Sequence, residues 1–157
     1  MQKNSSVDFL PVGLRIRGKR ILIVGGGKVG FHKASLLRRF TSEVTVVSPV
    51  FQAGFSELPF ELRRKEYDLS DLENMRLVYI CTENHELNRR IKADAGQIGL
   101  LASVCDTPLL CDIISPAVCR IGNLSISVSS DGKDVKRSIR IRDRINELIE
   151  KGLLYID

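Results

Sequence analysis

Short apolar runs alternate with more polar segments over the first two thirds of the chain. The runs with the length and β-branched composition of buried strands are 20–24, 43–48, 77–81 and 101–105. Residues 60–67 alternate enough to predict a further strand, and residues 31–40 and 85–95 place apolar side chains at helical spacing. Strands that are apolar throughout and alternate with helices are typical of a parallel sheet with both faces covered.

The pattern changes after residue 112. Residues 113–118 and 124–128 predict two strands around a turn at Gly122-Asn123, and residues 135–151 predict an amphipathic helix. The strand over 124–128 alternates cleanly, so one of its faces meets solvent or a partner. We therefore expect an α/β fold, with a Rossmann-like parallel sheet in residues 1–112 and a small α+β segment in residues 113–157.

Composition excludes several classes of protein. A chain of 157 residues with 43% hydrophobic and 27% charged residues has the size and balance of a single globular domain with a small appendage. No apolar run approaches the roughly 18 residues of a membrane span, and the first twenty residues lack the core of a signal peptide. We expect a cytoplasmic protein that has no membrane partner. Its four cysteines form no CxxC pair, which favours buried thiols over disulfides or zinc ligands.

A glycine-rich segment follows the strand over 20–24 at once and opens a helix. Its sequence, GGGKVG, satisfies the G-x-G-x-x-G pattern in the strand–turn–helix context that dinucleotide binding requires. Gly25 permits the tight turn, Gly27 lets backbone N–H groups approach a pyrophosphate, and Gly30 lets the helix pack closely. The alternative is a tight turn without a ligand. We expect these residues to bind the cofactor: Gly25, Gly26, Gly27, Lys28, Val29 and Gly30.

The residue that would hold the adenosine ribose lies at the end of the second strand. An acid at this place is typical of NAD sites and a nearby arginine of NADP sites, but the chain has Val46-Val47-Ser48-Pro49. Ser48 can contact a ribose hydroxyl, and an ordinary buried strand end explains it equally well. The residues therefore leave the choice between NAD and NADP open.

Asp106 follows the fifth strand and precedes Pro108. Ligands of doubly wound sheets bind beyond the carboxyl ends of the strands, which puts Asp106 near the nicotinamide end of a bound dinucleotide. Its carboxylate can accept a proton as a hydride leaves the substrate, or ligate a metal ion. A turn aspartate before a proline is the alternative, and Asp112 is interpreted as a local turn former.

Several motifs, in order over roughly residues 9–145, resemble the precorrin-2 dehydrogenase family, the dehydrogenase/ferrochelatase module of siroheme synthesis. The first comprises Phe9-Leu10-Pro11, Leu14, Gly18-Lys19, Leu22 and the run from Val24 to Lys33. The second is Cys81-Thr82 with Leu87-Asn88, and the third is the run from Ser103 to Ala117. One departure is the family's G-G-x-S-P, which is replaced here by Asp-Gly-Lys-Asp-Val at 131–135.

The resemblance implies NAD-dependent oxidation of precorrin-2 to sirohydrochlorin, in some members followed by insertion of ferrous iron. It places the catalytic aspartate, and any iron ligand, on Asp106, and an NAD-binding threonine on Thr82. Thr82 is also suited to cap the helix over 85–95. Ser129 and Lys133 are the candidate substrate-binding residues, and the family's homodimer forms through about residues 113–145. A non-catalytic, NAD-sensing dimeric module is the alternative.

The net charge of +5 favours anionic partners. Residues 15–39 contain eight basic side chains and no acid: Arg15, Arg17, Lys19, Arg20, Lys28, Lys33, Arg38 and Arg39. We interpret this block as a local complement to a dinucleotide and a polycarboxylate substrate. The basic residues of the C-terminal helix are interleaved with Asp143, Glu147 and Glu150, so they predict a solvated face rather than a nucleic-acid site.

Overall fold

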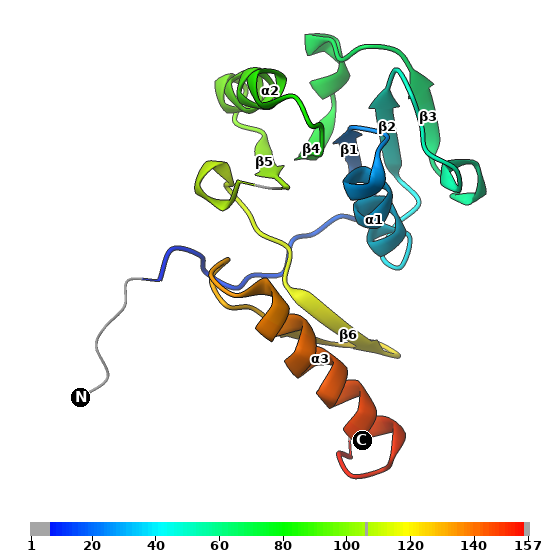
Figure 1. Cartoon of the computed structure of the whole chain (residues 1–157), viewed down its shortest axis with the longest axis vertical. Coiled ribbons are helices and arrows are strands. Elements are labelled where there is room, and N and C mark those ends of the chain that lie inside the picture. Colours follow the sequence, from blue (N-terminus) through cyan, green and yellow to red (C-terminus); the bar gives the residue numbers. More distant parts are fainter. Residues whose placement is uncertain (1–6, 106, 156–157) are drawn as a thin grey trace. The chain divides into compact units, whose positions relative to one another are not determined.

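The computed structural model describes residues 7–105 and 107–155, which form two compact units. The sheet unit comprises residues 13–113. The C-terminal unit comprises residues 114–155 together with the described N-terminal residues 7–12. Figure 1 shows the elements of each unit.

The sheet unit has five parallel strands in the order β3-β2-β1-β4-β5, which confirms the predicted α/β fold class. The strands are β1 (Arg20–Val24), β2 (Val44–Ser48), β3 (Glu61–Arg64), β4 (Met75–Ile80) and β5 (Leu101–Val104). The helices are α1 (Lys28–Leu37) and α2 (His85–Gln97). Short 3-10 turns occur at η1 (Phe55–Glu57), η2 (Leu69–Leu72) and η3 (Pro108–Leu110).

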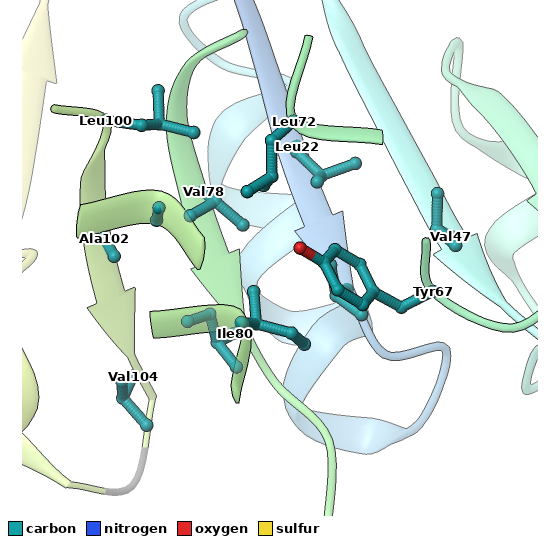
Figure 2. Packing of buried hydrophobic residues seen from close by; sticks show 12 residues of the cluster. Leu22, Val47, Tyr67, Leu72, Val78, Ile80, Leu100, Ala102 and Val104 are labelled. Carbon is teal, nitrogen blue, oxygen red and sulfur yellow. The ribbon is translucent and has the colours of Figure 1, made fainter. Parts of the chain in front are cut away.

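Each face of the sheet is buried under one of the two helices. Leu22, Val78 and Ala102 pack with Ile91 and Ala95 of α2 on one face, and Figure 2 shows this cluster. The other face is a separate cluster in which the alternate strand residues pack with α1; its strand and helix members are Ile21, Ile23, Val44, Val46, Leu77, Tyr79, Ala34 and Leu37. Burial on both faces explains why β1 and β2 read as apolar runs without alternation.

Several element boundaries of the sheet unit depart from the sequence prediction. Strand β3 ends at Arg64 rather than at residue 67, because Tyr67 turns into the core and donates its hydroxyl to Asp94 at 3.0 Å. Helix α1 begins at Lys28, three residues before the predicted start. Helix α2 continues through Gly96 to Gln97, and the left-handed residue after it is Gly99, with φ +68°.

The C-terminal unit contains an antiparallel hairpin of β6 (Ala117–Ile121) and β7 (Leu124–Val128), followed by α3 (Val135–Glu150). Strand β6 begins at Ala117, four residues later than predicted, because Pro116 has no N–H to donate and Ile113 packs in the sheet unit. Asp131 holds residues 7–12 in this unit by accepting the backbone N–H groups of Asp8 and Phe9 at 3.1 and 2.8 Å. In the described part of the chain, no helix has the length and apolar character to cross a membrane.

Candidate dinucleotide site

The strand order indicates which edge of the sheet holds the candidate site. Strands β2 and β3 lie on one side of β1, and β4 and β5 lie on the other, so the order reverses between β1 and β4. Open α/β sheets bind ligands beyond the carboxyl ends of the strands at such a switch point. The segments at this point are the glycine-rich turn after β1 and residues 81–84 after β4.

Gly25 and Gly30 have the tight geometry that the sequence predicted for them. Gly25 has φ +121°, and a side chain there would overlap the carbonyl oxygen of Cys81 at the end of β4. A Cβ on Gly30 would overlap the carbonyl of Gly25, so α1 packs directly on the turn. These two glycines thus bring the start of α1 up against the switch point.

The need for Gly26 is a feature that the sequence reasoning missed. A Cβ at this position would overlap the Val50 carbonyl and lie 2.9 Å from the Ser48 side chain. The Gly26 carbonyl also accepts the backbone N–H of Gln52 at 2.9 Å. The segment after β2 is therefore fastened to the glycine-rich turn, and the two loops form one rim.

The start of α1 fits an anionic group. Gly27 is the N-cap and supplies no side-chain hydrogen bond, and the first turn has no acidic residue. The helical hydrogen bonds begin with Phe31, which donates to the Gly27 carbonyl at 2.9 Å, so the N–H groups of Lys28, Val29 and Gly30 precede the ladder. A Cβ on Gly27 would meet open space, which leaves room for a pyrophosphate at the positive end of the helix dipole.

Ser48 has a local structural role at the predicted ribose position. Its side chain is buried and its hydroxyl donates to the Val50 carbonyl at 2.7 Å. That bond uses the only hydroxyl proton, so Ser48 can meet a ribose only as an acceptor. The predicted ribose contact stays a prediction.

Thr82 does not cap α2; the cap is Asn84, whose side chain accepts the N–H of Leu87 at 3.0 Å. Thr82 Oγ1 instead lies 2.5 Å from Oδ1 of Asn88, and the Asn88 amide donates to the Thr82 carbonyl at 2.9 Å. Asn88 is only 2% exposed. It therefore fixes both the hydroxyl and the backbone of the residue that the family resemblance assigns to NAD.

The role of Asn88 was not recognised from the sequence beyond its place in a family motif. A usable signal exists, because Asn88, Ile91 and Ala95 share the buried face of α2. A polar residue in an otherwise apolar stripe must find a buried partner, and here the partner is the loop after β4.

Asp106, the predicted catalytic residue and candidate iron ligand, lies outside the described residues. The chain on its far side is fastened to β5. Cys111 Sγ lies 3.2 Å from both the N–H and the carbonyl of Val104, and burial raises the pKa of its thiol. Asp112 accepts the N–H of Ala102 at 3.0 Å and pairs with Lys92 at 2.7 Å. Asp112 is therefore not a local turn former, because its partners lie ten and twenty residues away.

The two predicted substrate residues, Ser129 and Lys133, lie in the C-terminal unit, where both contact Asp131. Lys133 Nζ is 2.8 Å from the Asp131 carboxylate, which raises the pKa of the lysine. The hydroxyl of Ser129 accepts the N–H of Asp131 at 3.3 Å. The predicted contacts of Ser129 and Lys133 with substrate stay predictions.

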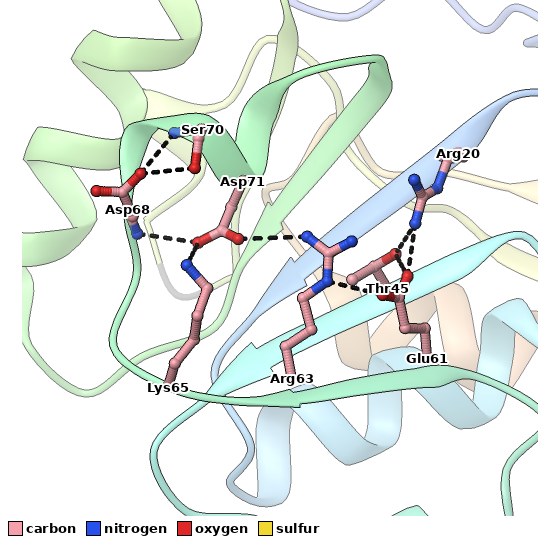
Figure 3. Close-up of polar contacts among 8 residues, drawn as sticks. All are labelled: Arg20, Thr45, Glu61, Arg63, Lys65, Asp68, Ser70 and Asp71. Carbon is pink, nitrogen blue, oxygen red and sulfur yellow. Dashed lines mark hydrogen bonds and ion pairs between the residues drawn. The ribbon is translucent and has the colours of Figure 1, made fainter.

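The basic block of residues 15–39, which we interpret from the sequence as a complement to a dinucleotide, does not gather at the glycine-rich turn. Arg20 begins β1 at the opposite edge of the sheet, where it pairs with Glu61 at 2.5 Å and donates to Thr45 at 3.0 Å (Figure 3). Arg38 and Arg39 follow the other end of α1, and Lys33 lies over the Tyr79 ring at 4.6 Å. The turn joins the end of β1 to the start of α1, so basic residues before β1 or late in α1 lie away from it. Of the eight basic residues, all of them described, only Lys28 lies at the turn itself.

The family model described as "Putative NAD(P)-binding" matches residues 12–117, well over half of the chain. The chain belongs to this NAD(P)-binding family. The match spans the glycine-rich turn and all five strands of the sheet unit. The uncapped helix start, the open space at Gly27 and the absence of an acid from the first turn of α1 are the features that fit the cofactor.

Relatives of this NAD(P)-binding chain include siroheme synthases. The siroheme synthase of Psychrobacter arcticus is 35% identical over 150 residues, which cover 93% of this chain and 27% of that protein. The siroheme synthase of Ectopseudomonas mendocina is 34% identical over 145 residues, which cover 91% of this chain and 31% of that protein. The chain thus spans less than a third of the length of either relative.

A solved structure, that of SirC, precorrin-2 dehydrogenase, has the same fold. It superposes with a TM-score of 0.78 at 24% sequence identity and covers 88% of this chain and 70% of that one. The predicted relation to the siroheme family is therefore supported by the sequence relatives, and the solved structure shows that the fold is shared.

Proposed function

We propose that this chain oxidises precorrin-2 to sirohydrochlorin with NAD as the acceptor. The observation that carries the proposal is the uncapped start of α1 behind Gly25–Gly27, placed at the β1/β4 switch point of a parallel sheet. Two further facts support it: the siroheme synthase relatives and the family motif that surrounds Asp106. We assign the substrate from the similarity to these relatives. We assign the cofactor from that similarity together with the geometry of the glycine-rich turn.

The residues of the chain would divide the work between binding and proton transfer. The N–H groups of Lys28, Val29 and Gly30 would hold the pyrophosphate, and Thr82, fixed by Asn88, would line the site beside them. Bound NAD supplies the hydride acceptor at the nicotinamide ring. The substrate loses one hydride and one proton, and we assign the proton to the carboxylate of Asp106. Positioning of the two reactants supplies most of the remaining rate enhancement.

Turnover by the purified chain tests this proposal. The chain is mixed with precorrin-2 and NAD under anaerobic conditions, and the absorbance of sirohydrochlorin and NADH is followed. We expect equal amounts of the two products, and we expect Asp106→Asn to slow the reaction by about 100-fold or more. The affinity of the variant for NAD, measured by calorimetry, should stay unchanged.

The outcomes separate the alternatives. NAD binding without turnover would reject the enzyme and favour a non-catalytic NAD-sensing module. If Asp106→Ala retains a rate within a few-fold of the parent chain, the role assigned to Asp106 is wrong.

We further propose that the active form is a homodimer formed through the C-terminal unit. The exposed side chains of Ile139 and Ile141 on α3 support this assignment. Sedimentation of the same preparation tests it, and a strictly monomeric active chain would reject it.

A parallel reaction with ferrous iron tests insertion of the metal into sirohydrochlorin. A cytoplasmic location and the lack of a nucleic-acid partner stay predictions from the sequence.

A further inference from the structure

An arginine lies beside the predicted ribose position in the sheet, although the residues directly after Ser48 in the sequence include no arginine. Ser48 at the end of β2 is in register with Arg64 at the end of β3. Both residues lie at the carboxyl edge of the sheet, the edge that carries the glycine-rich turn. Parallel strands are about 4.8 Å apart, so Arg64 is the immediate lateral neighbour of the residue where a ribose is expected.

The Arg64 guanidinium is held on the segment that closes over the glycine-rich turn. It lies 5.5 Å from the centre of the Phe51 ring, and its Nη1 donates to the Pro49 carbonyl at 3.4 Å. Arg64 and Phe51 also line the same pocket. Because Gln52 of this segment donates to Gly26, the guanidinium is linked to the turn through a short and continuous set of contacts.

The ring beneath the guanidinium is itself supported. Phe51 packs edge-on against Phe55 at 5.3 Å, and Phe55 packs in the same way against Phe31 of α1 at 5.3 Å. A guanidinium held over a supported ring is restricted in its motion and still has N–H groups to donate to a phosphate.

Arg64 differs in its ion pairing from Arg63 and Lys65, the basic residues on either side of it in the chain. Arg63 pairs with Glu61 at 2.8 Å and with buried Asp71 at 3.5 Å, and Lys65 pairs with Asp71 at 2.8 Å (Figure 3). Arg64 has no carboxylate in ion-pair range within residues 7–105 and 107–155. The end of β2 also lacks the acid that would repel a 2′-phosphate on the ribose.

We propose that Arg64, held over the Phe51 ring beside Ser48, binds the 2′-phosphate of NADP, so that the site accepts NADP as well as NAD. The inference rests on the dinucleotide site of the proposed function and is independent of the tetrapyrrole substrate. A guanidinium can donate two parallel hydrogen bonds to a phosphate, whereas NAD offers only a neutral hydroxyl at this place. Arg64 is thus a cofactor-specificity residue for this chain.

Calorimetric titration of the whole chain with NAD and with NADP tests the proposal without any turnover. We expect the parent chain to bind NADP with a Kd no more than tenfold above its Kd for NAD. Arg64→Gln should raise the Kd for NADP by about tenfold or more and change the Kd for NAD by less than about twofold. Arg64→Lys, which keeps the charge, should restore part of the loss.

The matched control is Arg38→Gln, which removes an exposed arginine from the other end of α1 and should change neither Kd. The proposal is overturned if the parent chain binds NADP more than tenfold more weakly than NAD. It is also overturned if Arg64→Gln changes both Kd values alike, because Arg64 would then only support the loop. If the parent chain binds neither dinucleotide, the proposed function fails as well, whereas tight NAD binding with poor NADP binding rejects this inference alone.

Discussion

The sheet unit and the C-terminal unit bury their side chains very differently. Among the described residues, every buried hydrophobic side chain except Cys119 belongs to the sheet unit. The sheet unit has two apolar layers, each covered by its own helix. In the C-terminal unit, Ile139 and Ile141 of α3 are 39% and 41% exposed.

The C-terminal unit depends instead on polar contacts near its surface. Asp131 accepts the N–H groups of Asp8 and Phe9 and pairs with Lys133, and Asp134 caps α3 by accepting the N–H of Arg137. Contacts of this kind contribute far less to stability than apolar burial does. The cofactor site is therefore built on a core that the sheet unit buries by itself, whereas the C-terminal unit leaves the apolar side chains of Ile139 and Ile141 partly exposed.

Truncation of a core isoleucine should give the largest effect. Ile91 of α2 is fully buried, so Ile91→Ala should lower the free energy of unfolding by about 2–5 kcal/mol. The control is Ile141→Ala, which removes the same atoms from an exposed position of α3 and should cost less than about 1 kcal/mol at dilutions that keep the chain monomeric. Urea unfolding measures both, and equal losses would contradict the contrast between the two units.

Alanine at two nearby positions of the glycine-rich turn should lower the free energy of unfolding by different amounts, and the larger loss should be smaller than that of Ile91→Ala. Gly25→Ala combines a left-handed backbone with an overlap on the Cys81 carbonyl, and should lower the free energy of unfolding by about 2–4 kcal/mol. Gly27→Ala places the same methyl group in open space and should cost about 1 kcal/mol or less.

The second variant also separates folding from binding. Gly27→Ala should fold normally and lose affinity for NAD, because its methyl group occupies the approach to the helix N–H groups. Thermal unfolding combined with calorimetric titration measures both properties. Unchanged affinity for NAD would show that the dinucleotide does not approach at Gly27.

Patterns that depend on burial could be predicted from the sequence. The strands and helices of the sheet unit were expected because their apolar runs and helical spacing report which faces are buried. The sequence suits Thr82 to cap α2, but Asn84 is the cap. Both are good capping residues, and the contact of Thr82 with Asn88 distinguishes them. Local propensity carries no record of that contact.

The sequence predicted the candidate-site residues that lie close together in the chain, and it missed those that only the pairing of strands brings together. Gly25 and Gly30 lie in one contiguous motif, and the structure gives them the expected turn and close packing. Arg64 lies beside Ser48, the predicted ribose position, only through the register of β3 on β2, which no contiguous pattern encodes. The same cause misled the charge analysis, since Arg20 is close to the turn in sequence and at the other edge of the sheet in space.

The smallest expected effect concerns the polar anchor of the C-terminal unit. The ion pair with Lys133 and the N–H groups of Asp8 and Phe9 hold the pKa of Asp131 below its ordinary value of 3.8. A lowered pKa means that the anchor is fully present above pH 3.8 and is lost as the pH falls through the lower pKa. The amide NMR signal of Phe9 should therefore titrate below pH 3.8, and Asp131→Asn should abolish that titration while Asp68, which has its own lowered pKa in the sheet unit, still titrates. A midpoint above 3.8 for the Phe9 amide would mean that Asp131 does not hold the N-terminal segment in this unit.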